Sequence, residues 1–220
     1  KEESVLKSIP ICEEYGDYDF LDFNCGCPVP KVIKQHSGSY WLNREDELIS
    51  LLRKMVTISS KPVIVKIRIG YSSIMDIVPL CKRIEEAGVK AIAVHGRTRS
   101  EFFSSPVHYD VIKDIKKNVS IPVIANGEIT QNNFQSVFDE TDADAVMIGQ
   151  HAIGYPKIFS DMIAIEENRP VEETTIFSQL NDFRKHLDLI FSIKDERSAA
   201  SIMRSFAVNY VKGFSDSKKY

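Results

Sequence analysis

Short apolar runs recur along the chain, and each one ends in a polar or glycine-containing stretch. Five of them lie at residues 18–24, 62–70, 90–96, 121–127 and 143–149, and all but the first contain β-branched residues. Predominantly apolar runs of this length are typical of strands that are buried on both faces of a sheet. The pattern therefore predicts five buried strands.

Amphipathic segments fill the spaces between these runs. Residues 44–56 and 74–88 have helical apolar spacing, and Gly88 is a typical helix stop. Strands that alternate with helices indicate parallel βα units. A (β/α)8 TIM barrel has about 250 residues and three more units than the five counted here. A doubly wound open sheet needs only five, and the pattern alone does not choose between the two architectures.

The pattern changes in the last third of the chain. Residues 177–193 and 197–214 have helical apolar spacing and no strand signal. The acidic, proline-containing stretch 166–175 precedes them, and we interpret it as a linker. The prediction is a βα domain over residues 1–165, followed by a small all-helical domain over residues 176–220.

Charge is unevenly distributed along a chain whose formal net charge is −3. From Arg184 onward, eight basic residues stand against four acidic ones, which suggests an anionic partner for this tail. Ordinary solvated charge is the alternative. Four cysteines are too few for a disulfide scaffold of this length. With no apolar run long enough for a bilayer and no signal peptide, we expect a reducing, cytoplasmic setting and no membrane partner.

Polar residues stand at the ends of the predicted strands, where parallel βα folds gather their active sites. In chain order they are Asn24, Cys25, Gly26 and Cys27; Lys66 and Arg68; His95, Arg97 and Arg99; Asn126, Gly127 and Glu128; and Gly149 and Gln150. Cationic side chains inside an apolar strand are costly unless something anionic meets them. The glycine turns at 127 and 149 offer backbone N–H groups to a phosphate.

Phosphate is commonly bound after strands seven and eight of a βα barrel. If the turns at Gly127 and Gly149 follow those two strands, the first predicted strand is the fourth of eight. The first three strands would then precede Lys1.

Three roles compete for the thiols of Cys25 and Cys27: structural, metal-binding or catalytic. Zinc is the weakest, because zinc cysteines are usually two to four residues apart and no second pair follows. Cys12 and Cys81 fall in helix-like segments, and we expect both to be buried structural thiols. Cys27 comes directly before Pro28 at a strand end, and for it we favour chemistry.

Five motifs follow one another in the chain: DFNCGCPVPKV from Asp22, PVIVKIRIG from Pro62, VHGRTR from Val94, IPVIANGEI from Ile121 and DAVMIGQHAIGYPKIF from Asp144. Together they resemble the tRNA-dihydrouridine synthases, and MRSFAVNYVKG in the tail is similar to that family's helical domain more loosely. The resemblance implies an FMN-bearing βα barrel with a helical tRNA-binding domain. It also implies an oxidoreductase that reduces the C5–C6 bond of particular tRNA uridines, with NADPH as reductant.

The resemblance assigns roles to individual residues. Reduced flavin would give hydride to C6, and Cys27 would give a proton to C5. Asn24 would hold the uracil, Arg68 would face the same cavity, and Lys66 and His95 would lie at the flavin ring. The FMN phosphate site would consist of Asn126, Gly127, Glu128, Gly149 and Gln150. The basic tail would bind tRNA phosphates while the target base is extruded, and no metal is implied.

Some positions depart from the family pattern. Gln150 stands where the family often has arginine, and Glu128 where aspartate is usual. Glu101, Phe103 and Ser105 stand where the family tends to have glutamine, tyrosine and glycine. A carboxylate near bound RNA is unfavourable, so we expect the loop that holds Glu101 to be rearranged.

Two other functions stay open at this point. One is a different FMN barrel enzyme, similar to dihydroorotate dehydrogenase, that acts on a free pyrimidine. The helical basic tail argues against it, because a small substrate needs no such domain. The other is a barrel that binds RNA without catalysing the reaction. It is motivated by Gln150, by Glu101 and by the absence of the first three expected strands from this sequence. A protein that takes up no FMN would favour the non-catalytic alternative, whereas binding of tRNA with no preference over free uridine would favour the free-pyrimidine enzyme.

Overall fold

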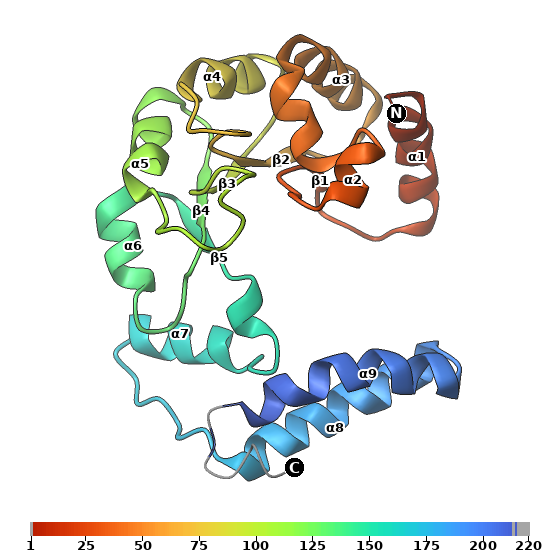
Figure 1. The fold of residues 1–220 in the computed structure, drawn as a ribbon, viewed down its shortest axis with the longest axis vertical. Helices are drawn as coiled ribbons and strands as arrows, with labels where there is room; N and C mark the ends of the chain where they lie inside the picture. Colours follow the sequence, from red (N-terminus) through yellow and green to blue (C-terminus); the bar gives the residue numbers. More distant parts are fainter. Residues whose placement is uncertain (1, 213, 215–220) are drawn as a thin grey trace. The chain divides into compact units, whose positions relative to one another are not determined.

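The computed structural model describes residues 2–212 and 214, which form two compact units (Figure 1). The first unit comprises residues 2–127 and 135–147, and the second comprises 128–134, 148–212 and 214. This division into compact units differs from the expected functional domains, which stay a prediction. The part of the expected tail at 213 and 215–220 lies outside the described residues.

All five predicted strands form in the first unit. They are β1 (Leu21–Cys25), β2 (Val63–Arg68), β3 (Ile92–His95), β4 (Val123–Asn126) and β5 (Ala145–Met147). They make one parallel sheet in the order β1-β2-β3-β4-β5. The register pairs Asn24 with Lys66, and it pairs His95 with both Arg68 and Asn126. Sequential pairing therefore gathers the predicted site residues of these four strands at one edge of the sheet.

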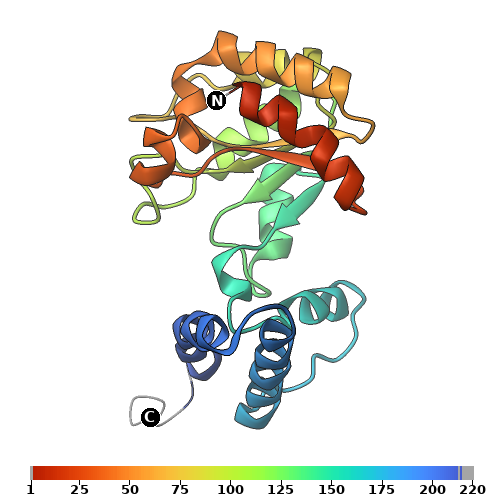
Figure 2. The same cartoon turned by 90° about the vertical axis from the view of Figure 1, so that its right-hand side faces the viewer.

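Helices connect the strands of the first unit. They are α1 (Glu2–Tyr15), α2 (Pro30–Lys34), the 3-10 helix η1 (Gly38–Asn43), α3 (Glu45–Ile58), α4 (Val78–Glu86), α5 (Tyr109–Asn118) and α6 (Phe134–Thr141). Helices α3 to α6 follow one another around the outer side of the curved sheet (Figure 1). Helix α1 lies beside α3, as Figure 2 also shows.

The strand order decides between the two candidate architectures. Right-handed crossovers that always step to the next strand in the same direction place every helix on one side of the sheet. A doubly wound sheet instead reverses its strand order partway and carries helices on both faces. The sequential order and the one-sided helices confirm the βα arrangement of a TIM barrel.

The core lies between the sheet and helices α3, α4 and α5. These helices contribute fully buried side chains, namely Leu48, Leu51, Leu52, Leu80, Ile84, Ile112 and Ile115. Strands β2 and β3 are buried along almost their whole length, as predicted. The same prediction is wrong for β1 and β5, which are only partly buried. These two strands stand at the edges of the five-stranded sheet, where one side has no neighbouring strand.

Cys12 and Cys81, the two cysteines predicted to be buried, differ in their exposure to solvent. Cys81 is buried on α4, as predicted, and burial raises its pKa to about 12. The prediction is wrong for Cys12, which is exposed. Helix α1 buries a single residue, Ile9, so most of its surface, including Cys12, faces water.

The second unit contains η2 (Gln150–Ala152), α7 (Ile158–Glu166), α8 (Ile176–Ile193) and α9 (Glu196–Val211). The last two helices confirm the predicted helical pair. Thr175 begins α8 with a capping box, accepting a 3.1 Å hydrogen bond from the Ser178 N–H, and Asp195 caps α9 at 3.0 Å. Across residues 2–212 and 214, every helix is too short or too polar to span a bilayer.

Gly154 holds the turn after η2 against the backbone of α9. Its φ is +79°, in the left-handed region that favours glycine. A Cβ at this position would come within 2.5 Å of the Asn209 carbonyl carbon and oxygen. Only glycine fits this contact without a shift of the turn or of α9.

The Gly154→Ala substitution should therefore destabilise the second unit. We expect a loss of more than about 1 kcal/mol, because backbone strain and a backbone clash combine. Chemical denaturation followed by circular dichroism measures the loss. Ser201→Ala, at an exposed position of α9, serves as the control and should change stability by less than about 0.5 kcal/mol. Equal stability of the two variants would refute the packing role of Gly154.

Candidate functional site

The turn after β1 presents Cys27. The Asn24 side-chain oxygen accepts hydrogen bonds of 3.0 Å from the backbone N–H groups of Gly26 and of Cys27. Such a side-chain-to-backbone turn fixes the loop without a second strand or helix. Cys27 is half-buried, whereas Cys25 is fully buried, and burial raises the pKa of the Cys25 thiol well above its usual range. Cys25 is therefore a structural thiol, and Cys27 is the thiol that can meet a substrate.

Gly38 holds Cys27 from the other side. Its φ is +62°, and a Cβ there would lie 2.7 Å from the Cys27 carbonyl oxygen and 2.8 Å from the Cys27 Cβ. The adjacent Ser39 N–H donates a 3.0 Å hydrogen bond to the same carbonyl. The position of Cys27 thus depends on close backbone approach, a requirement that the strand-end argument did not predict.

Arg68 joins two loops at the carboxyl edge of the sheet. Its side chain is buried, with 2% of the residue exposed. Nε donates to the Gly26 carbonyl at 3.0 Å, and Nη1 donates to the carbonyls of Thr98 at 2.8 Å and Phe102 at 3.0 Å. Arg68 therefore fastens the turn that carries Cys27 to the loop after β3.

Lys66 lies two residues before Arg68 on β2, on the same face of the sheet, and is half-buried. Burial, together with the neighbouring Arg68 charge, lowers the pKa of Lys66 to about 8, while Asp22 opposes the shift. Burial and Arg97 similarly lower the pKa of Arg68 to about 10. Lys66 remains largely protonated at neutral pH, and the site edge carries a concentrated positive charge.

His95 ends β3 as a buried, neutral imidazole. Burial and the nearby charges of Arg68, Lys66 and Arg97 lower its pKa to about 3. Its Nε2 atom has no hydrogen-bond partner among residues 2–212 and 214. Buried polar atoms in proteins are rarely left unpaired, so this nitrogen suits a hydrogen bond to a bound molecule.

Glu101 is held inside the loop after β3. One carboxylate oxygen accepts a 2.6 Å hydrogen bond from the Thr98 N–H, and the other lies 3.0 Å from His108 Nε2. Burial alone would raise the pKa of Glu101, but these hydrogen bonds outweigh it and lower the pKa to about 2. The carboxylate that departs from the family pattern is therefore engaged within its own loop.

The predicted phosphate residues belong to both units. Asn126 donates from Nδ2 to the Met147 carbonyl at 2.8 Å, and Gly127, with φ +128°, accepts from the Tyr109 hydroxyl at 2.6 Å. In the second unit, the Glu128 carboxylate lies 3.3 Å from His151 Nε2. Gly149 has open space around the position of a Cβ, and the exposed Gln150 begins η2. Their shared phosphate role stays a prediction.

The described part of the chain contains no cluster of three histidine, cysteine or carboxylate side chains that could hold a metal ion. The carboxyl edge brings together a thiol, the cations Lys66, Arg68 and Arg97, and a neutral imidazole.

Comparisons with solved structures define the class of fold. An old yellow enzyme homologue from Zymomonas mobilis aligns with a TM-score of 0.52 at 16% identity, over 81% of this chain and 54% of that one. YagE, a prophage protein of the dihydrodipicolinic acid synthase family from E. coli K12, aligns with a TM-score of 0.56 at 12% identity, over 94% and 74%. These likenesses show a shared α/β fold and nothing more.

Sequence comparisons identify the family. The family model described as Dihydrouridine synthase (Dus) matches residues 2–220. The tRNA-dihydrouridine synthase B of Pasteurella multocida (strain Pm70) is 34% identical over 214 residues, which is 96% of this chain and 64% of that protein. The probable tRNA-dihydrouridine synthase of Rickettsia bellii (strain RML369-C) is 33% identical over 226 residues, 100% of this chain and 68% of that protein. The chain belongs to the dihydrouridine synthase family.

The chain is shorter than its curated relatives. It spans 64% of the Pasteurella protein, and its 42% identical match to tRNA-dihydrouridine synthase B of Proteus vulgaris covers 45% of that protein. Because the matches cover only part of these relatives, we treat their activity as a proposal for this chain.

The low pKa of His95 predicts a pH-dependent stability. In the unfolded chain a histidine has a pKa of about 6.5. The unfolded state therefore binds more protons at His95 than the folded state does between about pH 6.5 and pH 3. Stability should fall as the pH is lowered through this window, by on the order of 1 kcal/mol per pH unit from His95.

Urea unfolding at pH 7 and pH 5 measures this effect. His95→Asn should lose less stability between the two pH values than the unsubstituted chain does. His36→Asn removes an exposed imidazole and should leave the loss unchanged. An equal loss in the His95→Asn variant would contradict the buried, neutral state of His95.

Proposed function

We propose that this chain forms the catalytic part of a tRNA-dihydrouridine synthase, which uses FMN and NADPH to reduce uridine to 5,6-dihydrouridine in tRNA. One observation carries the proposal: the Asn24 turn holds the Cys27 thiol beside the loop that Arg68 fastens to it. Membership of the dihydrouridine synthase family supports it, as does the similarity to proteins named tRNA-dihydrouridine synthase.

The carboxyl edge of the first unit fits a flavin. Lys66 supplies a positive charge that acts on His95, whose Nε2 atom is unsatisfied, and these are the two groups that the family resemblance assigns to the flavin ring. A protonated lysine stabilises negative charge that develops on a bound ring. When bound, FMN would supply the hydride that is added to C6 of the uracil, after reduction by NADPH. The assignment of the FMN phosphate to Asn126, Gly127, Glu128, Gly149 and Gln150 remains part of this proposal.

Cys27 would complete the reduction as general acid. Hydride addition at C6 leaves a carbanion at C5, and the Cys27 S–H bond breaks to protonate it. The resulting thiolate takes up a proton from solvent, so the C5–C6 double bond is reduced by two electrons and gains two hydrogens.

Asn24 and Arg68 would position the reacting groups. The Asn24 oxygen is occupied by two backbone N–H groups, so its Nδ2 donors are the atoms suited to a uracil carbonyl. Arg68 spends Nε and Nη1 on three backbone carbonyls. These bonds give Arg68 a positioning role, since they hold the Cys27 turn, and the substrate contact that the resemblance implies stays part of this proposal.

The two competing functions have less support. Nothing in the geometry favours a free pyrimidine substrate over a uridine in tRNA. For a non-catalytic RNA-binding protein, one motive is weakened because Glu101 is paired within its loop. The motive from Gln150, which stands in place of arginine, is unaffected.

Replacement of the thiol tests the proton donor. Cys27→Ala should retain FMN binding but lower the rate of dihydrouridine formation by about 10²–10⁴-fold, the usual contribution of a general acid. Mass spectrometry of the tRNA product measures the rate. Cys12→Ala removes an exposed thiol on α1 and should react at the unsubstituted rate. Undiminished turnover by Cys27→Ala would exclude the proton-donor role.

The charge of Lys66 predicts a pH-dependent flavin affinity. Because its pKa is about 8, Lys66 loses its charge as the pH rises from 7 to 9, and affinity for FMN should fall over this interval. Lys66→Arg stays protonated throughout and should bind with little pH dependence. Flavin fluorescence titration gives the affinities, with Lys61→Arg, at an exposed position before β2, as the control. A Lys66→Arg variant with the same pH profile as the unsubstituted chain would disprove the Lys66 contact.

A further inference from the structure

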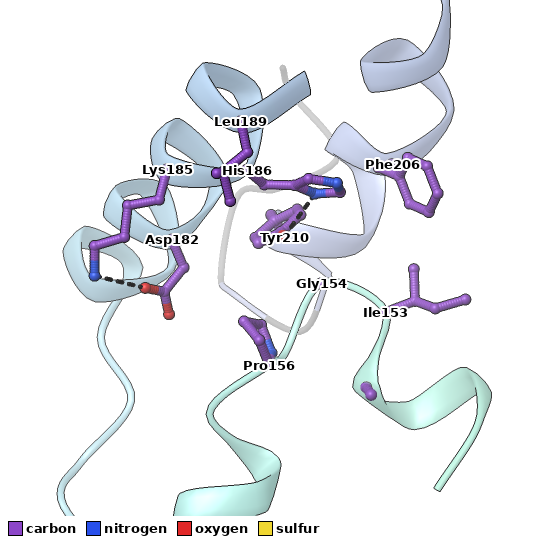
Figure 3. A pocket seen from close by; sticks show the side chains of 10 residues that line it. Ile153, Gly154, Pro156, Asp182, Lys185, His186, Leu189, Phe206 and Tyr210 are labelled. Carbon is purple, nitrogen blue, oxygen red and sulfur yellow. Dashed lines mark hydrogen bonds and ion pairs between the residues drawn. The ribbon is translucent and has the colours of Figure 1, made fainter. Parts of the chain in front are cut away.

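The second unit contains an apolar cavity of about 460 Å³ between the turn after η2 and the helices α8 and α9 (Figure 3). Ile153 and Pro156 line it from the turn, His186 and Leu189 from α8, and Phe206 and Tyr210 from α9. A cavity of this size accommodates a small planar molecule, and it is too small for a helix or a peptide strand of several residues.

The aromatic walls of this cavity are held in place. His186 Nδ1 lies 3.1 Å from the Tyr210 hydroxyl, the contact drawn between the two facing side chains in Figure 3. Tyr210 is buried and packs edge-to-face on Phe183, with ring centroids 5.3 Å apart. The Phe206 ring lies 5.3 Å from the His186 ring. Fixed aromatic rings offer a stacking surface to a heteroaromatic ring.

The rim of the cavity carries groups that can bind the polar edge of such a ring. Asp182 and Lys185 form an ion pair of 3.4 Å at this rim, and the Lys185 side chain is 66% exposed. A carboxylate accepts hydrogen bonds from ring or exocyclic amino groups. An exposed lysine can move to a phosphate.

A second, polar cavity of about 630 Å³ adjoins the first, because Ile153 lines both. Gln179, Asn209 and Lys212 contribute to its wall. Gln179 is only 9% exposed, and its Oε1 atom has no hydrogen-bond partner within residues 2–212 and 214. A buried, unpaired acceptor next to an exposed lysine suits a ligand that brings both a hydroxyl donor and an anion.

We infer that the two cavities together bind one unstacked nucleotide of RNA, distinct from the uridine that is reduced. The base enters the apolar cavity, stacks on one of the rings of His186, Phe206 and Tyr210, and meets the other two at a tilt. The ribose hydroxyls donate to Gln179 Oε1, and the phosphate meets Lys212. An acyl chain would fill the apolar cavity but leave Gln179 unpaired, so the combination favours a nucleotide. This inference rests on the proposed tRNA substrate.

Affinity for a tRNA transcript tests the inference, measured by filter binding with FMN added so that the flavin is already in place, since Gln150 also lines the polar cavity. Phe206→Ala removes a stacking wall and should weaken binding by roughly fivefold to a hundredfold. Leu189→Trp fills the cavity from a position that is 66% exposed, where folding tolerates the change, and should weaken binding similarly. Phe177→Ala, 81% exposed on α8 and outside the cavity, is the control and should bind within about twofold of the unsubstituted chain, as most surface substitutions cost under about 0.5 kcal/mol.

A transcript containing 4-thiouridine then locates the base. Irradiation should cross-link it to a peptide that includes His186, Phe206 or Tyr210. Unchanged affinity in both Phe206→Ala and Leu189→Trp, or cross-links only elsewhere, would overturn the nucleotide site while leaving the proposed function intact. Failure of the unsubstituted chain to bind tRNA would overturn both.

Discussion

The geometry of the candidate site depends on the buried guanidinium of Arg68. A charge with 2% exposure is tolerated only when hydrogen bonds replace its water, because the burial of an ion without partners costs on the order of several kcal/mol. Arg68 finds its partners in the carbonyls of Gly26, Thr98 and Phe102. Because β2 lies between β1 and β3, the Arg68 side chain reaches the loops that follow both neighbouring strands. These contacts hold the turn that carries Cys27 in one position.

The same burial sets the electrostatics. Lys66 and Arg68 repel one another and are poorly hydrated, so their pKa values are lowered while both remain protonated at neutral pH. His95 responds to these charges by staying neutral. The outcome is a positive edge with one free imidazole nitrogen, which favours an anionic, hydrogen-bonding ligand. The Glu101 carboxylate is not free to pair with these cations, because it is hydrogen-bonded to the Thr98 N–H and lies 3.0 Å from His108 Nε2.

Much of the fold could be predicted from local patterns. The five apolar runs gave the strands, and alternation along β2 placed Lys66 and Arg68 on one face. The choice of a barrel over a doubly wound sheet depends on the order of pairing, which single runs do not encode. The half-exposed β1 and β5 follow from their places at the sheet edges. Burial of Cys12 was predicted wrongly because helical spacing shows which residues share a face, but not whether another element covers it.

The details of the site lay beyond sequence patterns for a different reason. The partners of Arg68 are backbone carbonyls, and their directions depend on loop dihedrals such as the positive φ of Phe102. Gly38 lies eleven positions beyond Cys27 and meets it only through the path of the intervening loop. The sequence shows Gly38 between polar residues, which indicates a turn. It does not show that this turn packs against Cys27. The link between Glu101 and His108 is likewise a property of the closed loop.

The most direct test of the central claim is a titration of the chain with FMN, followed by visible absorbance. If the carboxyl edge formed by β1 to β4 holds the flavin, the bands of added FMN should shift and the change should saturate at one FMN per chain. Flavin bands that stay identical to those of free FMN across the titration would contradict the account.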